Sequence, residues 1–438
     1  MQMAANAATG KERLEGSGSH KPFTGAVSVI TSPSIDAISS FSSESLGDDA
    51  EVIADTKSAQ TAGDFQISIG NPEKHVNVME TFVSFQITTK VLDPQARPDL
   101  IESEYKVRRR YNDFLWLRSR LVSENPTHII PPLPEKHNLK EQLDRYSREF
   151  IHQRIFLLQK FILRLADHPT LSFNKYFIVF LTAKPATFIQ CRRHEESILS
   201  RLSSSMHNLV LSHSPRSPEF QAVSDYISNL GEKLHAIEKI AHRIHLVRKQ
   251  YVKEEKELPL ALNAWASAEQ ELSHMLHCVL DAIEKCNAAH KHLLTSFVPQ
   301  FLLPLHEYTL YVDAVKEALI RRDHLQVEHE RMVQDLEKKR LAKAHVEAGQ
   351  GDSAMLFSAF FNRGTSDTDA LRDERLEKLD NSIQDLQKSI GEKGDRTAIG
   401  DADFCADLER WHSVKDQDLK TILSDHANRH VLMYEEVG

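Results

Sequence analysis

The sequence predicts an α+β domain with a three-stranded antiparallel sheet and several helices, followed by an all-α region of three long helices. Between Phe65 and about Arg109, apolar residues alternate with polar ones, a pattern typical of half-buried strands. From about residue 217 onward they recur every three or four positions, which indicates helices that bury one face. Glycine is scarce, at 15 of 438 residues, and this suits long helices better than turn-rich folds.

The composition limits the classes of function. A net charge of −9 argues against a general nucleic-acid binder, so any attraction to anionic lipid must come from local basic patches. No apolar run approaches the roughly 20 residues needed to span a bilayer, and the N-terminus lacks the pattern of a signal peptide. The four cysteines form no CxxC motif, so we expect reduced thiols and no metal site. These features predict a cytosolic protein whose membrane contact is peripheral.

The first 62 residues are rich in small and polar types and are predicted to be a disordered tail. The first domain is expected over residues 63–185. Its first strand is marked by alternating Phe65, Ile67 and Ile69, and its second by Val83, Phe85 and Ile87. A short third strand is expected at Glu104–Arg109. These apolar positions would face one core.

Helices complete this first domain. Asn112 stands where an N-cap belongs, and apolar residues at helical spacing follow it. The stretch Pro131–Pro134 excludes both a helix interior and a central strand. Beyond it, an amphipathic helix is expected to begin near Phe150 and to end at His168-Pro169. Strands, a helix, a proline loop and further helices make a compact α+β unit.

The helical region is expected over residues 217–438. One apolar-periodic run starts near Val223, a second covers Phe297 to His345, and a third extends from about Leu371 to the end. At 1.5 Å per residue the second helix alone would be roughly 70 Å long. Helices of this length must bury a stripe against other helices, in a coiled coil or an elongated bundle.

A basic constellation in the first domain has the chemistry of a phosphate site. Lys106, Arg108, Arg109 and Arg110 concentrate positive charge at a strand end, and Tyr111 and Asn112 follow at once; Lys136, Lys140 and Arg154 lie further along the chain. Guanidinium groups bind phosphate oxygens in pairs, an aromatic face stacks on a sugar ring, and lysine supplies a point charge. By itself the arginine run is also compatible with a solvated strand edge that discourages aggregation.

The combination of motifs is far more specific than the arginine run. VRRRYNDFLWLRSRL, IIPPLPEK, EFIHQRIFLLQKFI and ADHPTLSFNKYFIVFLT together resemble a PX domain of the sorting nexin type. This resemblance implies that Arg110 takes the 3-phosphate of phosphatidylinositol 3-phosphate and that Tyr111 stacks on the inositol ring. It also implies that Asn112 lines the pocket, that Lys136 reaches the 1-phosphate and that Arg154 holds the ring hydroxyls. Lys140 falls in the loop that approaches the membrane.

The remainder of the chain resembles the BAR domain of the same class, especially the group of sorting nexins 4, 7 and 30. The stretches AWASAEQEL, PLHEYTLYVDAVKEALIRRDHLQ and LERWHSVKDQDLK carry this likeness. It implies a curved dimer, either with itself or with another PX-BAR sorting nexin, whose basic face lies on anionic membrane. Basic residues between 321 and 343 are either such contacts or a solvated helix face. The family's last helix usually continues beyond the position where this chain ends, which leaves the strength of the dimer open.

Two apolar stretches remain open between alternatives. Residues 186–216 connect the domains as either an interfacial amphipathic helix or a linker helix packed at the junction. The apolar patch within residues 355–361 lies in the expected loop between the second and third long helices. There it could insert into lipid, bind a partner or cap the bundle.

The sequence therefore predicts a non-enzymatic protein without a cofactor. It contains no GxxxxGK[ST], HExxH or GxSxG motif. By resemblance it binds phosphatidylinositol 3-phosphate on the cytosolic face of early endosomes, as a BAR dimer acting in cargo recycling and autophagy, without binding nucleic acid. The alternative is a coiled-coil scaffold whose PX-like unit binds protein rather than lipid.

Overall fold

The computed structural model describes residues 60–76, 81–136, 147–202, 216–348 and 365–437. All of these belong to one compact unit of the chain, Val52–Gly438. Nearly all of the predicted N-terminal tail lies outside the described residues. So do Lys140 and the apolar loop at 355–361.

The sheet of the first domain is antiparallel throughout, in the order β1-β2-β3-β4. The three predicted strands are present as β2 (Phe65–Val76), β3 (Thr81–Val91) and β4 (Glu104–Arg110). The sequence did not predict β1 (Gln60–Ala62), which had been assigned to the end of the tail. Its three residues show no alternation of their own. They form a strand because they pair with β2.

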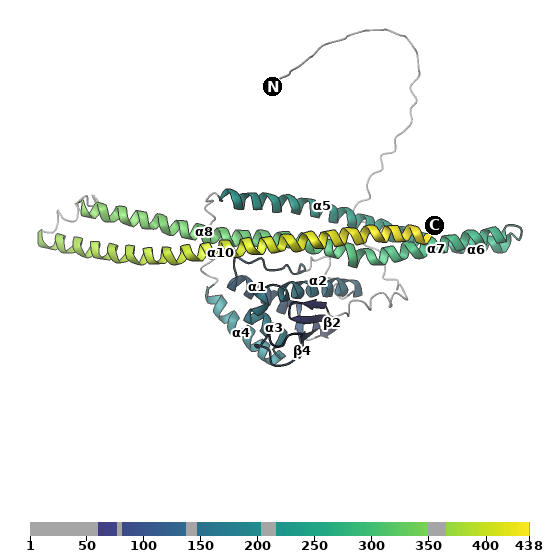
Figure 1. Cartoon of the computed structure of the whole chain (residues 1–438), viewed down its shortest axis with the longest axis horizontal. Helices are drawn as coiled ribbons and strands as arrows, with labels where there is room; N and C mark the ends of the chain where they lie inside the picture. The colour runs from purple at the N-terminus through teal and green to yellow at the C-terminus, as the bar shows by residue number, and fades with distance from the viewer. Residues whose placement is uncertain (1–59, 77–80, 137–146, 203–215, 349–364, 438) are drawn as a thin grey trace, which may run out of the picture. The chain divides into compact units, whose positions relative to one another are not determined.

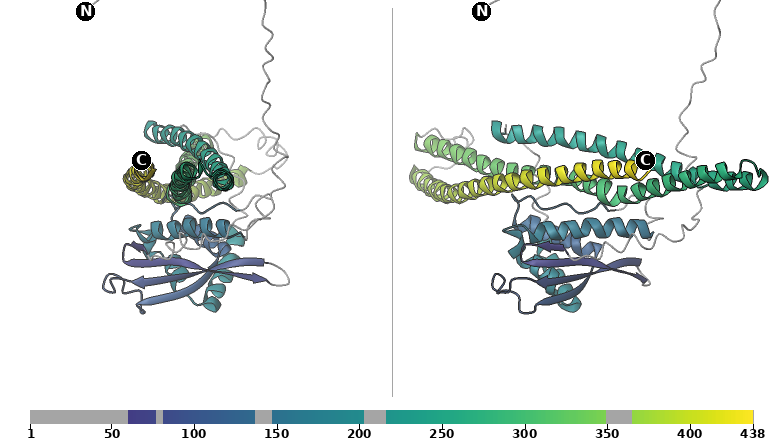
Figure 2. Two further views of the ribbon diagram at one scale, coloured as in Figure 1. Left: turned by 90° about the vertical axis from the view of Figure 1, so that its right-hand side faces the viewer. Right: turned by 45° about the vertical axis from the view of Figure 1, so that its right-hand side comes forward.

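The inner face of this sheet packs against helices to form the first core. The helices are α1 (Tyr111–Glu124), α2 (Arg148–Ala166), the short η4 (Leu171–Phe173), α3 (Lys175–Thr182) and α4 (Pro185–Leu202). The fully buried side chains of this core include Phe65, Ile67, Phe85, Ile87, Phe114, Leu117, Leu158, Phe161, Phe177 and Phe180. Figure 2 shows α2 between the sheet and the long helices.

The predicted N-cap of α1 is wrong by two positions. The helix begins at Tyr111, and Arg110 is its N-cap residue, with an extended backbone. The carboxylate of Asp113 accepts a hydrogen bond from the backbone N–H of Arg110 at 2.8 Å, which satisfies a donor at the helix start. Because Asp113 does the capping from inside the helix, Asn112 is not needed as a cap and lies exposed in the first turn.

The second half of the described chain is helical. Its elements are α5 (Pro218–Glu255), α6 (Leu258–Ala268), α7 (Ser273–Phe297), the π-helical η6 (Val298–Leu302), α8 (Leu303–Glu347) and α10 (Thr365–Val437). The second predicted helix thus starts earlier than expected, since α7, η6 and α8 follow one another without a break. Pro304 stands at the second position of α8, directly after the π-helical turn of η6.

The long helices bury one shared apolar stripe. In Figure 1, α8 and α10 lie side by side along most of the length of α8, and α5 runs beside them. The stripe combines Ile227 and Leu234 of α5, Val312, Val315 and Leu319 of α8, and Phe404, Leu408 and Trp411 of α10. This is the packing that helices of such length require. Among the described residues, no helix combines the length and the apolar character needed to cross a bilayer.

Candidate functional site

The strand alternation of β4 sends its three arginines to different places. Arg108 points to the outer face, where it donates to the carbonyl oxygen of Asn71 at 2.8 Å and pairs with Glu73 at 3.1 Å. Arg109, only 1% exposed, points into the core. Arg110 ends the strand on the same face as Arg108, because successive side chains alternate between faces. The basic run therefore divides into one buried arginine, Arg109, and two arginines on the opposite face of the strand.

Arg109 fastens the end of α3 to the sheet. Its Nε donates to the carbonyl oxygen of Phe180 at 3.0 Å and its Nη2 to that of Ala183 at 2.6 Å. Its guanidinium also lies 4.1 Å from the ring centroid of Phe188 in α4. Burial lowers the pKa of Arg109 to about 10, with Asp113 opposing that shift. The residue serves the fold and is not available to a ligand.

Tyr111 and Arg154 form the centre of the candidate site. The guanidinium carbon of Arg154, on α2, lies 4.1 Å from the ring centroid of Tyr111, at the start of α1. Nη2 of Arg154 also donates to the carbonyl oxygen of Glu135 at 2.9 Å, and the Tyr111 hydroxyl donates to that of Pro134. Burial raises the pKa of Tyr111, and the nearby Arg154 opposes the shift. β4, α1, α2 and the proline loop thus converge on one aromatic ring and one guanidinium.

The other predicted ligands surround this centre unequally. Arg110 is half-buried at the junction of β4 and α1, with its guanidinium carbon 5.1 Å from the ring centroid of Phe82. Lys136 follows Glu135 directly and is exposed, as is Asn112 in the first turn of α1. Lys140 lies outside the described residues. The structure therefore brings Tyr111 and Arg154 into contact, and chain connectivity keeps Arg110, Asn112 and Lys136 close by.

An aromatic platform beside Arg110 was missed by sequence reasoning. His75 on β2 pairs directly with Phe82 on β3, and the two rings stack with centroids 4.9 Å apart. Nε2 of His75 is also 2.7 Å from Oγ of Ser84, which pairs with Arg110 across the sheet. Strand register puts these side chains on one face. The alternation signal could have suggested this only if the pairing of β2 with β3 had been known.

The start of the linker and one arginine of the basic helix face make contacts within the chain. Phe188, in the first turn of α4, is buried in the core of the first domain, and Arg192 pairs with Asp113 at 3.0 Å. The beginning of the linker is thus a helix packed on the domain. On α8, Arg322 is buried and pairs with Asp401, so this residue of the basic run is not part of a membrane face.

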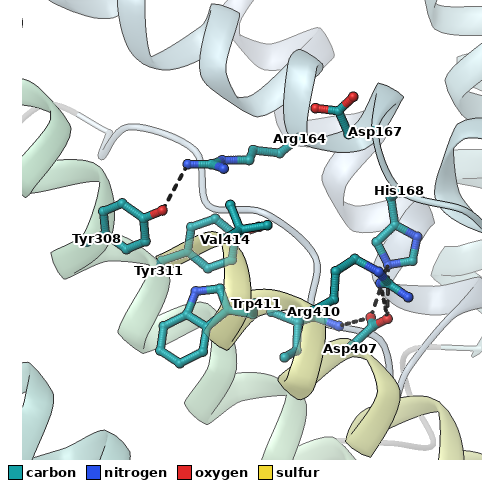
Figure 3. A pocket seen from close by; sticks show the side chains of 10 residues that line it. Arg164, Asp167, His168, Tyr308, Tyr311, Asp407, Arg410, Trp411 and Val414 are labelled. Carbon is teal, nitrogen blue, oxygen red and sulfur yellow. Dashed lines mark hydrogen bonds and ion pairs between the residues drawn. The ribbon is translucent and has the colours of Figure 1, made fainter. Parts of the chain in front are cut away.

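A polar junction joins the first domain to the long helices. Arg164 of α2 donates to Glu307 at 3.0 Å and to the Tyr308 hydroxyl at 3.1 Å on α8, and it also contacts Asp418 of α10. Burial tends to lower the pKa of Arg164, but Glu307 and its other neighbours raise it overall. A cavity of about 100 Å³ lies beside this cluster, and Figure 3 shows its lining side chains. No motif in the sequence indicated this cluster.

The second part of the junction centres on Asp407 of α10. Nδ1 of His168 accepts the backbone N–H groups of Thr170 and Leu171, both at 3.1 Å. A neutral His168 therefore carries its proton on Nε2, which donates to Asp407 at 3.1 Å. Nη1 of Arg410 donates to the same carboxylate at 2.6 Å and lies 2.9 Å from Nε2 of His168 (Figure 3). The two nitrogens are close because both donate to Asp407. His168 and Arg410 thereby compensate a buried carboxylate.

Comparison with known proteins gives a family match and several relatives of this chain. The PX domain family model matches residues 100–184. Mouse sorting nexin-30 is 36% identical over 377 residues, which cover 86% of this chain and 76% of that protein. Mouse sorting nexin-7 is 31% identical over 376 residues, covering 85% of this chain and 86% of that protein. Among solved structures, the cryo-EM structure of the SNX-BAR Mvp1 tetramer has a TM-score of 0.47 at 16% identity and covers 85% of this chain and 99% of that chain.

The extent of the match to the curated relatives is sufficient to assign the family. It spans both the sheet domain and the long helices, so it is not confined to the PX motifs. The predicted resemblance to the sorting nexin group that includes members 7 and 30 is confirmed. The chain belongs to the sorting nexin family, with a PX domain followed by the long helical region of a PX-BAR protein.

Proposed function

We propose that this sorting nexin binds phosphatidylinositol 3-phosphate through the site around Tyr111. The observation that carries the proposal is the contact of Arg154 with the Tyr111 ring, fixed on one side by Pro134 and Glu135. Such a ring offers an apolar face to an inositol, and the guanidinium beside it offers donors to ring hydroxyls. Arg110 supplies the charge for the 3-phosphate and Lys136 that for the 1-phosphate. Asn112 lines the pocket, and Lys140 approaches the membrane.

The helical region is proposed to dimerise. On α5, the residues Ile237, Ile240, Ile244, Val247 and Tyr251 are all exposed apolar side chains. Their spacing alternates between three and four residues, which is the pattern of a helix that buries a seam against another helix. Within the described residues of one chain this seam has no apolar cover. The partner that would cover this apolar seam with a seam of its own is a second PX-BAR chain, identical or related.

Two bound PX domains in one dimer would act at high effective concentration and convert a weak headgroup interaction into stable membrane binding. We therefore place the protein on the cytosolic face of early endosomes, where it would sort and recycle cargo and supply membrane for autophagy. No catalytic step enters this function. A lipid-hydrolysis assay with the purified protein checks that point, and measurable turnover would contradict it.

Replacing Arg110 by alanine tests the lipid site. The variant should bind vesicles containing phosphatidylinositol 3-phosphate at least about tenfold more weakly, because a charge-assisted contact to phosphate is lost. Liposome co-sedimentation with and without this lipid measures the effect. Arg108→Ala is the matched control: it removes the same charge two residues away, where the side chain pairs with Glu73, and should retain most binding. Equal binding by wild type and Arg110→Ala would favour the scaffold alternative.

Replacing Ile244 by glutamate tests the dimer. The substitution places a charge in the exposed α5 seam, where a partner helix would have to desolvate it, so the dimer should weaken by at least about tenfold. Mass measurement over a concentration series, for the chain alone and mixed with a related nexin, gives the dissociation constant. Lys253→Glu, on the same helix outside the seam, is the control. A wild-type chain that stays monomeric alone and in every mixture would contradict the proposal.

A further inference from the structure

One loop of the PX domain touches both the long helices and the proposed headgroup site. It runs from Asn125 to Lys136, between the end of α1 and the last described residue before α2. Its first half lies against α8 and α10, and its second half contains the proline stretch that holds Tyr111. Only a few residues of the loop separate the contacts of its first half from those of its second half.

The long helices hold the first half of this loop through its backbone. Asp407 of α10 accepts the backbone N–H of Ile129 at 3.0 Å. Arg321 of α8 donates to the carbonyl oxygens of Pro126 at 2.7 Å and His128 at 3.2 Å. Three main-chain groups within four residues are therefore fixed by side chains that belong to the helical region. Backbone contacts of this kind position a loop whatever its side chains are.

The approach of the loop to α10 depends on a glycine. A Cβ added at Gly400 would lie 2.8 Å from Cγ2 of Thr127, which is closer than real Cβ atoms come to a neighbour. Thr127 is itself buried, so its methyl group has little room to move away. The loop is thus packed onto α10 as tightly as its side chains allow.

A second link joins the middle of the loop to α8. Nε of Arg118, on α1, donates to the carbonyl oxygen of Pro131 at 3.2 Å. Nη2 of the same side chain donates to Glu317 of α8 at 2.6 Å. One guanidinium therefore ties the start of the proline stretch to the long helices, and Glu317 holds that guanidinium in place.

The second half of the loop forms a wall of the headgroup site. The carbonyl oxygen of Pro134 accepts the hydroxyl of Tyr111, and that of Glu135 accepts Nη2 of Arg154 at 2.9 Å. Between Pro131 and Pro134 three of four residues are prolines, whose fixed φ angle makes the segment stiff. A displacement at Ile129 or Pro131 is therefore carried along the chain to Pro134 rather than absorbed between them.

We propose that Asp407, Arg321 and the Arg118–Glu317 pair are positioning residues of the headgroup site, and that the affinity of the PX domain for phosphoinositide depends on its docking to the long helices. This rests on the function proposed above. None of these four residues lies at the centre of the site. They act through the loop, so that the helical region both dimerises and keeps the lipid site in its binding geometry.

The coupling must also run in the other direction. Because linkage is reciprocal, a headgroup that binds the ordered loop more tightly will stabilise the docking of that loop onto α8 and α10. The backbone N–H of Ile129, held by Asp407, reports on this docking directly. A purely structural role of Asp407 would not make that amide respond to a ligand bound at Tyr111.

The first test measures affinity for a soluble short-chain phosphatidylinositol 3-phosphate by titration calorimetry with the full chain. This probe excludes avidity and membrane curvature. Asp407→Ala should bind about three- to tenfold more weakly, and Glu317→Ala about twofold, within the range of measured coupling between sites. Asp313→Ala is the control, because this residue is also on α8, is 70% exposed and pairs with Lys316. Glu317 is itself half-exposed, so its removal leaves the core of the fold intact.

The second test measures hydrogen exchange at residues 125–136 with and without the same soluble lipid. In the wild type the lipid should slow exchange at Ile129, and in Asp407→Ala this slowing should be lost. Wild-type affinity in both Asp407→Ala and Glu317→Ala, with lipid-independent exchange at Ile129, would overturn the coupling while leaving the lipid site in place. A wild-type chain that fails to bind the soluble lipid would overturn the proposed function and the coupling with it.

Discussion

Replacing Arg109 by alanine is expected to lower the free energy of unfolding of the PX domain by about 3 kcal/mol. The substitution removes the donors for the carbonyl oxygens of Phe180 and Ala183, at the end of α3. A helix end whose buried carbonyls lose their partners bears the full desolvation cost of those groups. It also removes a cation stacked on Phe188 and leaves a cavity in the core.

Urea denaturation followed by tryptophan fluorescence measures this effect, since Trp116 packs edge-on against Phe188 in the same core. Arg108→Ala, on the adjacent position of the strand, should change the midpoint little, because that side chain lies on the outer face. Arg109→Lys should recover only a small part of the loss, since a single ammonium cannot reproduce the guanidinium fork. A midpoint for Arg109→Ala equal to that of Arg108→Ala would show that α3 does not depend on this cap.

Replacing Arg164 by alanine should have a comparably large effect, about 3 kcal/mol, at the junction with the long helices. Glu307 is buried, and without Arg164 its carboxylate has lost its ion-pair partner. Asp418 loses the same partner; burial tends to raise the pKa of that carboxyl, whereas Arg164 and the Tyr308 hydroxyl lower it. An uncompensated charge in a buried site costs more than the ion pair contributes when it is intact.

A double-mutant cycle separates the pair from its surroundings. Glu307→Gln should restore part of the stability of Arg164→Ala, so the two effects should be non-additive by roughly 1 to 3 kcal/mol in the midpoint analysis of urea denaturation. Arg148→Ala, at the exposed start of α2, is the control for removing a cation from that helix. Additive effects of Arg164→Ala and Glu307→Gln would contradict a direct contribution of this pair to docking.

The three-stranded core of the sheet and the long helices could be read from the sequence because each depends on local periodicity. Phe65, Ile67 and Ile69 alternate because one face of β2 is buried, and the α8 apolar residues recur every three or four positions because one face of that helix is buried. β1 escaped notice because three residues contain too few periods to show a pattern. The start of α1 was predicted two residues too late because Asp113 caps the helix from within.

Motif likeness singled out Arg110 among three consecutive arginines as a candidate ligand. It gave no separate role to Arg108 or Arg109. Only the pleat of β4 and the position of α3 make Arg109 a buried cap, and only strand register puts Phe82 and His75 next to Arg110. Likewise, Arg321 and Arg322 look alike in sequence, yet one holds the backbone of the 125–136 loop and the other pairs with Asp401.

By itself, the sequence determined that this protein has a PX-like α+β domain and a long-helix region, and which residues match the PX motifs. Those properties follow from short-range pattern, in which the informative residues lie within a few positions of one another. The tertiary structure alone decided which arginines serve the fold, and it placed Asp407 against the loop that holds Tyr111 and Glu317 against Arg118, which contacts that loop. The physical reason is that ion pairs and backbone contacts such as that of Asp407 with Ile129 join residues far apart in the chain, and no local periodicity encodes them.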